Sequence, residues 1–222
     1  MKKLYEEFKE ITGRYVGEIP GQARFGYDLS DMYDFFEIED IIKHDGAYKG
    51  LVIKFYDYQT RKVYQPFEQK ENIGYERPIF IDGIFYILQV DFNEGLANIY
   101  KYYPGKSLEK VFDYKIKDLS TYNLELIGTE LHLISQDSDS LEIYYPCRKT
   151  VKLAENESAL LIDEGKVYIS RWIEAGWDDK NNKEGVDYRY YEKLIIRDLD
   201  SNIIEERIGN LYQRHDGTWW LT

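Results

Sequence analysis

Short apolar runs separated by glycine-containing turns make up most of this 222-residue chain. The clearest series lies between residues 78 and 115 and contains four runs: Pro78–Ile81, Ile84–Asp91, Ala97–Tyr103 and Leu108–Tyr114. Apolar runs of this length, bounded by Gly, Pro, Asn and Asp, predict β-strands, and the Asp-Gly pair after the first run predicts a tight hairpin turn. We therefore expect four consecutive antiparallel strands in this segment.

The same plan recurs further along the chain. The next series of predicted strands is 124–127, 131–134, 141–146 and 150–153. The series after that is 159–162, 167–173, 187–198 and 203–208, and only two more strands follow it, 211–215 and 218–222. Tyr15–Val16 and Arg24–Tyr27 are expected to complete the last sheet, because closing a ring with strands from both ends leaves no exposed sheet edge.

Glycine turns mark the repeat. They recur at intervals of 37, 45, 37 and 52 residues, at Gly46, Gly83, Gly128, Gly165 and Gly217. A period of about 40 residues is typical of one four-stranded propeller blade. Over residues 15–222 the chain therefore resembles a β-propeller in the order of its strands and turns, without the Gly-His and Trp-Asp pairs of WD40 repeats. The resemblance implies an all-β fold of five four-stranded blades in a single domain, 1–222, whose first full blade begins near Phe35–Ile38.

One short helix is predicted near the N-terminus, over residues 2–12. Leu4, Phe8 and Ile11 recur at helical spacing and form one apolar stripe, and Gly13 is a natural helix stop. We expect this helix to pack its apolar stripe on the body of the domain.

Acidic residues outnumber basic ones, with 41 Asp and Glu against 29 Lys and Arg, which gives a net charge of −12. Binding to nucleic acid or to an anionic membrane is disfavoured, because both require clustered Lys and Arg. A basic protein partner or a cation is compatible with this charge, and so is a charge that only maintains solubility. The 22 Tyr, 10 Phe and 4 Trp residues suit pleated sheets and are also common at recognition surfaces.

The chain lacks the motifs of the common catalytic classes. No nucleophile elbow or glycine-rich phosphate loop occurs, and the three His residues fit no zinc-ligand spacing. The single cysteine, Cys147, can form no intramolecular disulfide, and no neighbouring base would activate it. We therefore predict no cofactor, no metal site and no catalytic residue.

The first ten residues do not resemble a signal peptide, because Glu6, Glu7 and Glu10 interrupt any apolar run. No apolar run elsewhere approaches the length of a membrane span. A cytoplasmic location is the expectation, and the sequence carries no signal for an oligomeric state.

The candidate binding residues follow from the propeller resemblance. In propellers, the loops between second and third strands lie on one face around the central channel, where ligands usually bind. Trp177 lies in the longest irregular stretch, 176–185, which we expect to be a polar loop. The alternative is that these turns use Asp for local hydrogen bonds. The loops carry the following candidates: Asp57, Asp91, Asp137, Asp139, Trp177, Asp178 and Asp179.

Three functions are compatible with these features. The first is a non-catalytic module that binds a basic protein through an acidic, aromatic rim. The second is a lectin-like module in which Trp177 stacks on a carbohydrate. The third is a glycoside-active enzyme, which needs two carboxyl groups about 5–10 Å apart. Its carboxylates would come from Asp34, Glu76, Glu125 and Glu157. The charge and the lack of catalytic motifs favour the first function.

Overall fold

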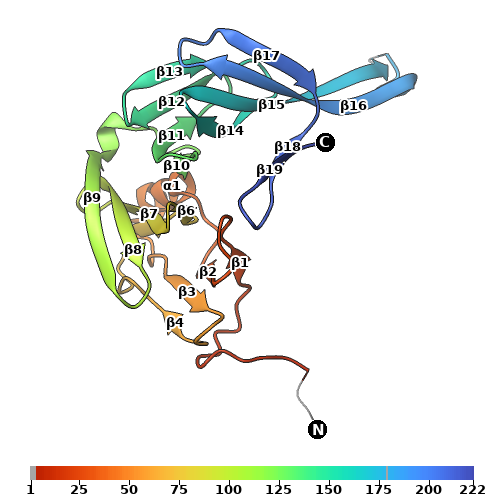
Figure 1. The fold of residues 1–222 in the computed structure, drawn as a ribbon. Coiled ribbons are helices and arrows are strands. Elements are labelled where there is room, and N and C mark those ends of the chain that lie inside the picture. Colours follow the sequence, from red (N-terminus) through yellow and green to blue (C-terminus); the bar gives the residue numbers. More distant parts are fainter. Residues whose placement is uncertain (1–3, 179) are drawn as a thin grey trace. The chain divides into compact units, whose positions relative to one another are not determined.

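The computed structural model describes residues 4–178 and 180–222, which form an all-β fold with 51% strand and 6% helix. The chain divides into two compact units. Unit 1 contains Met1–Leu126 and Arg214–Thr218, and unit 2 contains Ile127–Gln213 and Trp219–Thr222. Within each sheet the strands are antiparallel, and most of them pair with the strand that follows in the chain (Figure 1).

Two sheets belong to unit 1. The first has the strand order β1-β2-β3-β4, with the bounds Gly17–Glu18, Phe25–Leu29, Ile53–Asp57 and Val63–Tyr64. The second has the order β5-β7-β8-β9, with the bounds Ile73–Tyr75, Ile84–Asp91, Leu96–Tyr103 and Ser107–Lys115. A further short strand, β6 (Ile79–Ile81), also pairs with β7, and a 3₁₀ turn (Ile116–Asp118) follows β9.

The third sheet begins at the boundary of the units, and the remaining sheets belong to unit 2. The third sheet has the order β10-β11-β12-β13, with the bounds Glu125–Ile127, His132–Gln136, Ser140–Tyr145 and Lys149–Lys152. The fourth has the order β14-β15-β16-β17, with the bounds Glu157–Asp163, Lys166–Asp178, Lys183–Asp198 and Ile203–Ile208. The last two strands, β18 (Leu211–Gln213) and β19 (Trp219–Leu221), form a two-stranded sheet.

The strands predicted between residues 78 and 208 are confirmed, with shifts at their ends. The sequence pattern misses one strand, β5, which pairs with the second half of β7 and places Tyr75 opposite Gln89. The predicted inner strand, β6, pairs with the first half of β7. A three-residue strand that contains Gly74 carries too little apolar pattern to be recognised.

The predicted closure of the last sheet is wrong. Phe25 lies opposite Asp57 and Leu29 lies opposite Ile53, so β2 pairs with β3, while β18 and β19 form a sheet of their own. Strand β2 alternates half-buried and buried residues, and its partner β3 is mostly buried. The apolar residues of β2, Phe25, Tyr27 and Leu29, pack against the core of unit 1 in this pairing.

The predicted N-terminal helix is also wrong. The described part of this segment contains no helix, and residues 2 and 3 lie outside the described residues. Leu4 and Ile11 are 99% and 74% exposed, so they contact no core. Of the three residues of the predicted apolar stripe, only Phe8 packs against other rings, those of Tyr56 and Tyr58 near the end of β3. A short amphipathic segment is marginal as a helix without a surface that covers its apolar stripe.

The α-helix of the described residues is α1 (Phe35–Asp45), at the place where the sequence indicated the start of a blade. The side chain of Asp34 accepts a hydrogen bond from the N–H of Glu37, and the side chain of Glu37 accepts one from the N–H of Asp34. This reciprocal capping box begins the helix, and Gly46 ends it with a left-handed φ of 86°. Among the described residues, no helix combines the length and apolar character that a membrane crossing needs.

Each unit has its own core. The core of unit 1 is rich in aromatic rings, and Phe55 lies edge-on to Phe85 and Tyr102 with centroids 5.4 and 4.9 Å apart. The core of unit 2 is aliphatic and consists of Ile, Leu and Val side chains, such as Ile134 and Ile162. The two units therefore fill their cores with different kinds of side chain.

The packing of unit 1 predicts different effects of alanine at Gly46 and Gly50. Both glycines have positive φ, 86° and 83°, so alanine is strained at either position. A Cβ on Gly50 would lie 1.8 Å from the carbonyl oxygen of Lys70, whereas a Cβ on Gly46 would meet nothing within 4 Å. In urea denaturation we expect Gly46→Ala to lower the free energy of unfolding by about 1 kcal/mol and Gly50→Ala by about 3 kcal/mol or more. Equal losses would contradict the close approach.

Candidate functional site

The residues predicted to form an acidic rim belong to both units. Those of unit 1 are the last residues of their strands, and those of unit 2 lie at or next to hairpin turns. Asp179 lies outside the described residues. The described members are Asp57 and Asp91 in unit 1, and Asp137, Asp139, Trp177 and Asp178 in unit 2.

Asp57 is a structural carboxylate. Its side chain is 0% exposed and accepts hydrogen bonds from Nε and Nη2 of Arg24, at 3.1 and 2.7 Å. It also accepts bonds from the backbone of Gln59 and the hydroxyl of Thr60, both at 2.9 Å. The hydrogen bonds from Arg24 hold the pKa of Asp57 well below its ordinary range, against the opposing effect of burial. A partner therefore cannot contact this carboxylate without displacing Arg24.

Three other rim carboxylates stabilise the turns in which they lie. Asp91 accepts hydrogen bonds from the N–H groups two and three positions further on, at 3.0 and 3.1 Å, and Asp178 does the same at 3.1 and 3.3 Å. Asp137 accepts one from the next N–H at 2.6 Å. Hydrogen bonds from Asn181 lower the pKa of Asp178. These contacts agree with the alternative in which turns use Asp for local hydrogen bonds.

The stretch 176–185 is not a loop over most of its length, because β15 continues to Asp178 and β16 begins at Lys183. β14 pairs with β15 only as far as Arg171, and β17 pairs with β16 only as far as Lys193. Beyond these residues the two strands pair only with each other, and we call this two-stranded extension the arm. The Asn, Asp and Gly content of the segment suggested a loop, but a long hairpin tolerates it because both faces are solvated.

One face of the arm gathers aromatic side chains. The side chain of Tyr188 donates a hydrogen bond to Glu174 at 2.7 Å and lies edge-on to Trp177 with centroids 5.9 Å apart. The register between β15 and β16 shifts between Ala175 and Trp177, next to Gly176 with its φ of 82°. Trp177 is 41% exposed and Tyr190, opposite Glu174, is 68% exposed.

A second candidate site is a cavity of about 520 Å³ in unit 1, at the β5-β7-β8-β9 sheet. Side chains from all four strands contribute to a row of hydrogen bonds along it. Lys110 donates to Asn98 at 3.5 Å, Asn98 donates to Gln89 at 3.1 Å, and Gln89 donates to the hydroxyl of Tyr75 at 3.1 Å. Tyr100 also donates to Gln89, at 3.3 Å. We call these five residues the polar row.

Strand register explains the polar row. Tyr75 lies directly opposite Gln89, and Gln89 lies directly opposite Asn98, so the three side chains share one face. They are 3%, 6% and 5% exposed. A β-bulge between Ile99 and Tyr100 then aligns Tyr100 with Lys110. Buried polar groups are costly unless they are hydrogen-bonded, and this register provides the partners.

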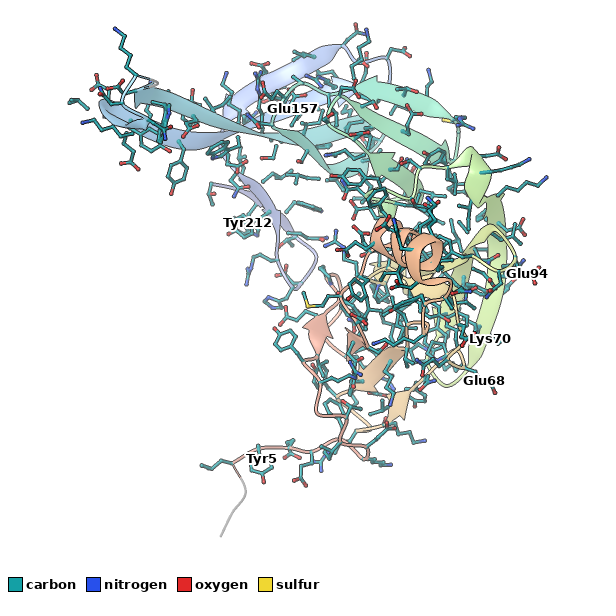
Figure 2. The ribbon with its side chains drawn as sticks, turned by 180° about the vertical axis from the view of Figure 1, so that it is seen from behind. Tyr5, Glu68, Lys70, Glu94, Glu157 and Tyr212 are labelled. Carbon is teal, nitrogen blue, oxygen red and sulfur yellow. The ribbon has the colours of Figure 1, made fainter. Side chains whose placement is uncertain are left out.

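The walls of the cavity combine aromatic and charged side chains. Phe67, from the segment between β4 and β5, stacks on Tyr75 and meets Tyr100 edge-on, with centroids 5.0 and 4.9 Å apart. Carboxylates and ammonium groups surround the opening, and Figure 2 shows three of them on one side of unit 1: Glu68, Lys70 and Glu94. The predicted rim residue Asp91 also lines this cavity.

The phenols of the polar row are neutral donors at physiological pH. Burial raises the pKa of Tyr75 far above its ordinary value, and it also raises the pKa of Tyr100. All donors in the row point from β9 towards β5. Among the described residues, the hydroxyl proton of Tyr75 has no acceptor, so the row ends in a donor at the cavity. Such aligned bonds polarise one another, which strengthens the terminal donor.

The sequence contained a signal for this site that the rim hypothesis did not use. Gln89 and Asn98 interrupt two strands that are otherwise apolar, Ile84–Asp91 and Ala97–Tyr103. Two amides at buried strand positions indicate a specific polar contact. Their proximity depends on the register between these two strands, which the sequence pattern did not supply.

The carboxylates considered for glycoside chemistry have other contacts and do not line this cavity. Asp34 caps α1, and Glu125 pairs with Arg77 at 3.0 Å. Glu157, in unit 2, pairs with Arg197 at 2.7 Å. Burial raises the pKa of Glu76. Among residues 4–178 and 180–222, no three His, Cys, Asp or Glu side chains are grouped so that they could hold a metal ion.

Comparisons of the chain with protein-family models, with curated proteins and with solved structures find no match. The assignment of a function therefore depends on the geometry of the site.

The contacts of Asp57 predict its effect on acid stability. Its depressed pKa contributes stability above the ordinary carboxyl pKa of about 3.9, and this contribution is lost as the pH falls below that value. We expect Asp57→Asn to lower the free energy of unfolding at neutral pH by about 3 kcal/mol and to flatten its fall between about pH 5 and 2. Denaturation at a series of pH values measures both, with Asp139→Asn as an exposed control. An unchanged slope would contradict the assigned role.

Proposed function

We propose that this protein is a non-catalytic carbohydrate-binding module whose site is the cavity at the β5-β7-β8-β9 sheet. The observation that carries the proposal is the polar row, which presents a buried phenol, two amides and an ammonium group in the lining of one cavity. A cavity of about 520 Å³ is within the range of small-molecule sites, about 300–1,000 Å³.

The chemistry of the lining favours a neutral sugar over an ion. Sugar hydroxyls both donate and accept, and the cavity offers donors at Tyr75 and Lys110 and an acceptor at Asp91. The cavity is lined by three carboxylates, those of Glu68, Asp91 and Glu94, and by two ammonium groups, those of Lys70 and Lys110. The lining therefore carries little net charge. The rings of Phe67 and Tyr100 add an apolar surface against which sugar C–H groups can pack.

The proposal predicts saturable binding of a neutral monosaccharide, measured by calorimetry with glucose, galactose, mannose and N-acetylglucosamine. We expect Lys110→Met and Asn98→Leu each to weaken binding at least tenfold, about 1.4 kcal/mol, because each removes a member of the polar row. Lys117→Met, an exposed lysine outside the cavity, is the matched control and should bind as the native chain does.

Lys110 is partly exposed, so its substitution should leave the melting temperature nearly unchanged and report on binding alone. Failure of every sugar to bind the native chain would overturn the proposal. So would equal affinity of the Lys110→Met and Lys117→Met variants.

A protein partner that docks on the arm is the second candidate function. It is favoured by the exposed aromatic face of Trp177 and Tyr190, because a two-stranded hairpin has no core of its own to cover these rings. Asp178 and the other acidic residues of the arm would suit a basic partner surface.

This second function predicts that a protein partner co-purifies with the native chain. The same partner should not co-purify with the double variant Trp177→Ser and Tyr190→Ser. Lys180→Ser, an exposed control on the same arm, should retain it. Binding should weaken as salt rises, because the Debye length is about 8 Å at physiological ionic strength. Retention by the double variant would exclude the aromatic face as the docking surface.

We also propose that the sheets are blades of a five-bladed β-propeller. Four consecutive antiparallel sheets, three of four strands and one of five, and a final two-stranded sheet support this arrangement. A cytoplasmic location is part of the same proposal, and the single free cysteine, Cys147, supports it because the chain needs no oxidising compartment for a disulfide.

A further inference from the structure

A second cavity of unit 1, about 330 Å³ in volume, is lined by Asp28, which has a buried carboxylate oxygen without a hydrogen-bond partner among the described residues. The cavity lies at the β1-β2-β3-β4 sheet, where Asp28 of β2 is directly opposite Lys54 of β3. Asp28 is 4% exposed. Its Oδ2 accepts a hydrogen bond from the hydroxyl of Tyr56, but among the described residues its Oδ1 has no hydrogen-bond partner.

An unpartnered buried carboxylate oxygen is costly, because the group has lost water and gained nothing in its place. Tyr56 cannot serve both oxygens, since its one proton is donated to Oδ2. Burial and the neighbouring Asp28 raise the pKa of Tyr56, which keeps the phenol protonated as this donor. The Oδ1 atom therefore requires a donor that the described chain does not supply.

Cationic side chains line the same cavity. Lys49 pairs with Asp31 at 2.8 Å, and Lys54 pairs with Glu10. Arg14 donates from Nη1 to a backbone carbonyl, that of Ser30, at 2.8 Å, and forms no ion pair among the described residues. The rest of its guanidinium group is a fork of donors that matches a carboxylate.

Two glutamine side chains add acceptors. The amide nitrogen of Gln65 donates to the carbonyl of Phe67 at 2.8 Å, and that of Gln69 donates to the carbonyl of Gly50 at 2.9 Å. These bonds fix both amides by their nitrogen atoms and leave their oxygen atoms as acceptors. The cavity thus contains an unpaired cation, an unpartnered anion oxygen and neutral acceptors.

We propose that this cavity binds a small zwitterion, a free α-amino acid, with its ammonium group on Oδ1 of Asp28 and its carboxylate on the guanidinium of Arg14. The ammonium group supplies the missing donor, and the carboxylate supplies the missing partner of the arginine. The site shares no lining residue with the sugar cavity, so this inference does not depend on the proposed carbohydrate function.

The test is titration of the full chain with the twenty common α-amino acids, followed by calorimetry or by NMR chemical shifts. Acetate and methylammonium serve as single-charge probes of the two halves of the site. We expect at least one amino acid to bind ten times or more tightly than either probe, because two charge-assisted contacts act together. Binding of acetate as tight as that of any amino acid would overturn the proposal in favour of a simple anion site.

Two variants separate binding from folding. Arg14→Met alters an exposed side chain and should weaken amino-acid binding at least tenfold, whereas Arg189→Met, an exposed control in unit 2, should not. Asp28→Asn should abolish binding while leaving the unliganded chain about as stable as before, since the amide oxygen can still accept the hydrogen bond from Tyr56. No binding by the native chain, together with a lowered melting temperature of Asp28→Asn, would show that Asp28 is structural and bonded to water.

Discussion

The register of β7 is the constraint on which the polar row of unit 1 depends. This strand is central in its sheet, with β8 along one edge and both β5 and β6 along the other, and Ile87, Leu88 and Val90 are 0% exposed. Because side chains alternate between the two faces, Gln89 meets its partners on β5 and β8 only in the observed register. A slip by one residue would move the amide to the other face and leave an apolar residue in the cavity.

The segment from Gln65 to Lys70 contributes side chains to both of the proposed binding cavities of unit 1. Gln65 and Gln69 line the cavity that contains Asp28, whereas Phe67 and Lys70 line the sugar cavity. The segment is held against Gly50, whose carbonyl accepts a hydrogen bond from Gln69 and whose Cα faces the carbonyl of Lys70. One short segment therefore shapes both proposed sites, and the absence of a side chain at Gly50 permits its close approach.

The acidic composition of the chain does not show which carboxylates are available for binding. Their individual contacts do. Asp57 is buried and fully used by Arg24 and its own turn, and Asp178 is used by its turn. Asp28 has the same side chain on a similar strand, yet one of its oxygens has no partner in the described chain. The difference arises from which groups the fold brings near each carboxylate, so net charge alone does not identify a binding residue.

The sequence by itself determined the strands between residues 78 and 208, because their alternation and their glycine turns are local. Asp82-Gly83 and Glu164-Gly165 both have positive φ, which a tight hairpin turn requires. Helix α1 was missed because its capping box, Asp34 with Glu37, begins in a run of apolar residues that also suits a strand.

Only the tertiary structure decided the partners of β2 and β5, the register of the strands and which side chains meet. The pairing of β2 with β3, the short strand β5 and the polar row all join residues that are far apart in the chain. The amides Gln89 and Asn98 were visible in the sequence as polar residues in apolar strands, but their shared face depends on inter-strand register. Register is set by backbone hydrogen bonds and burial across the whole sheet, and no local pattern in one strand contains that information.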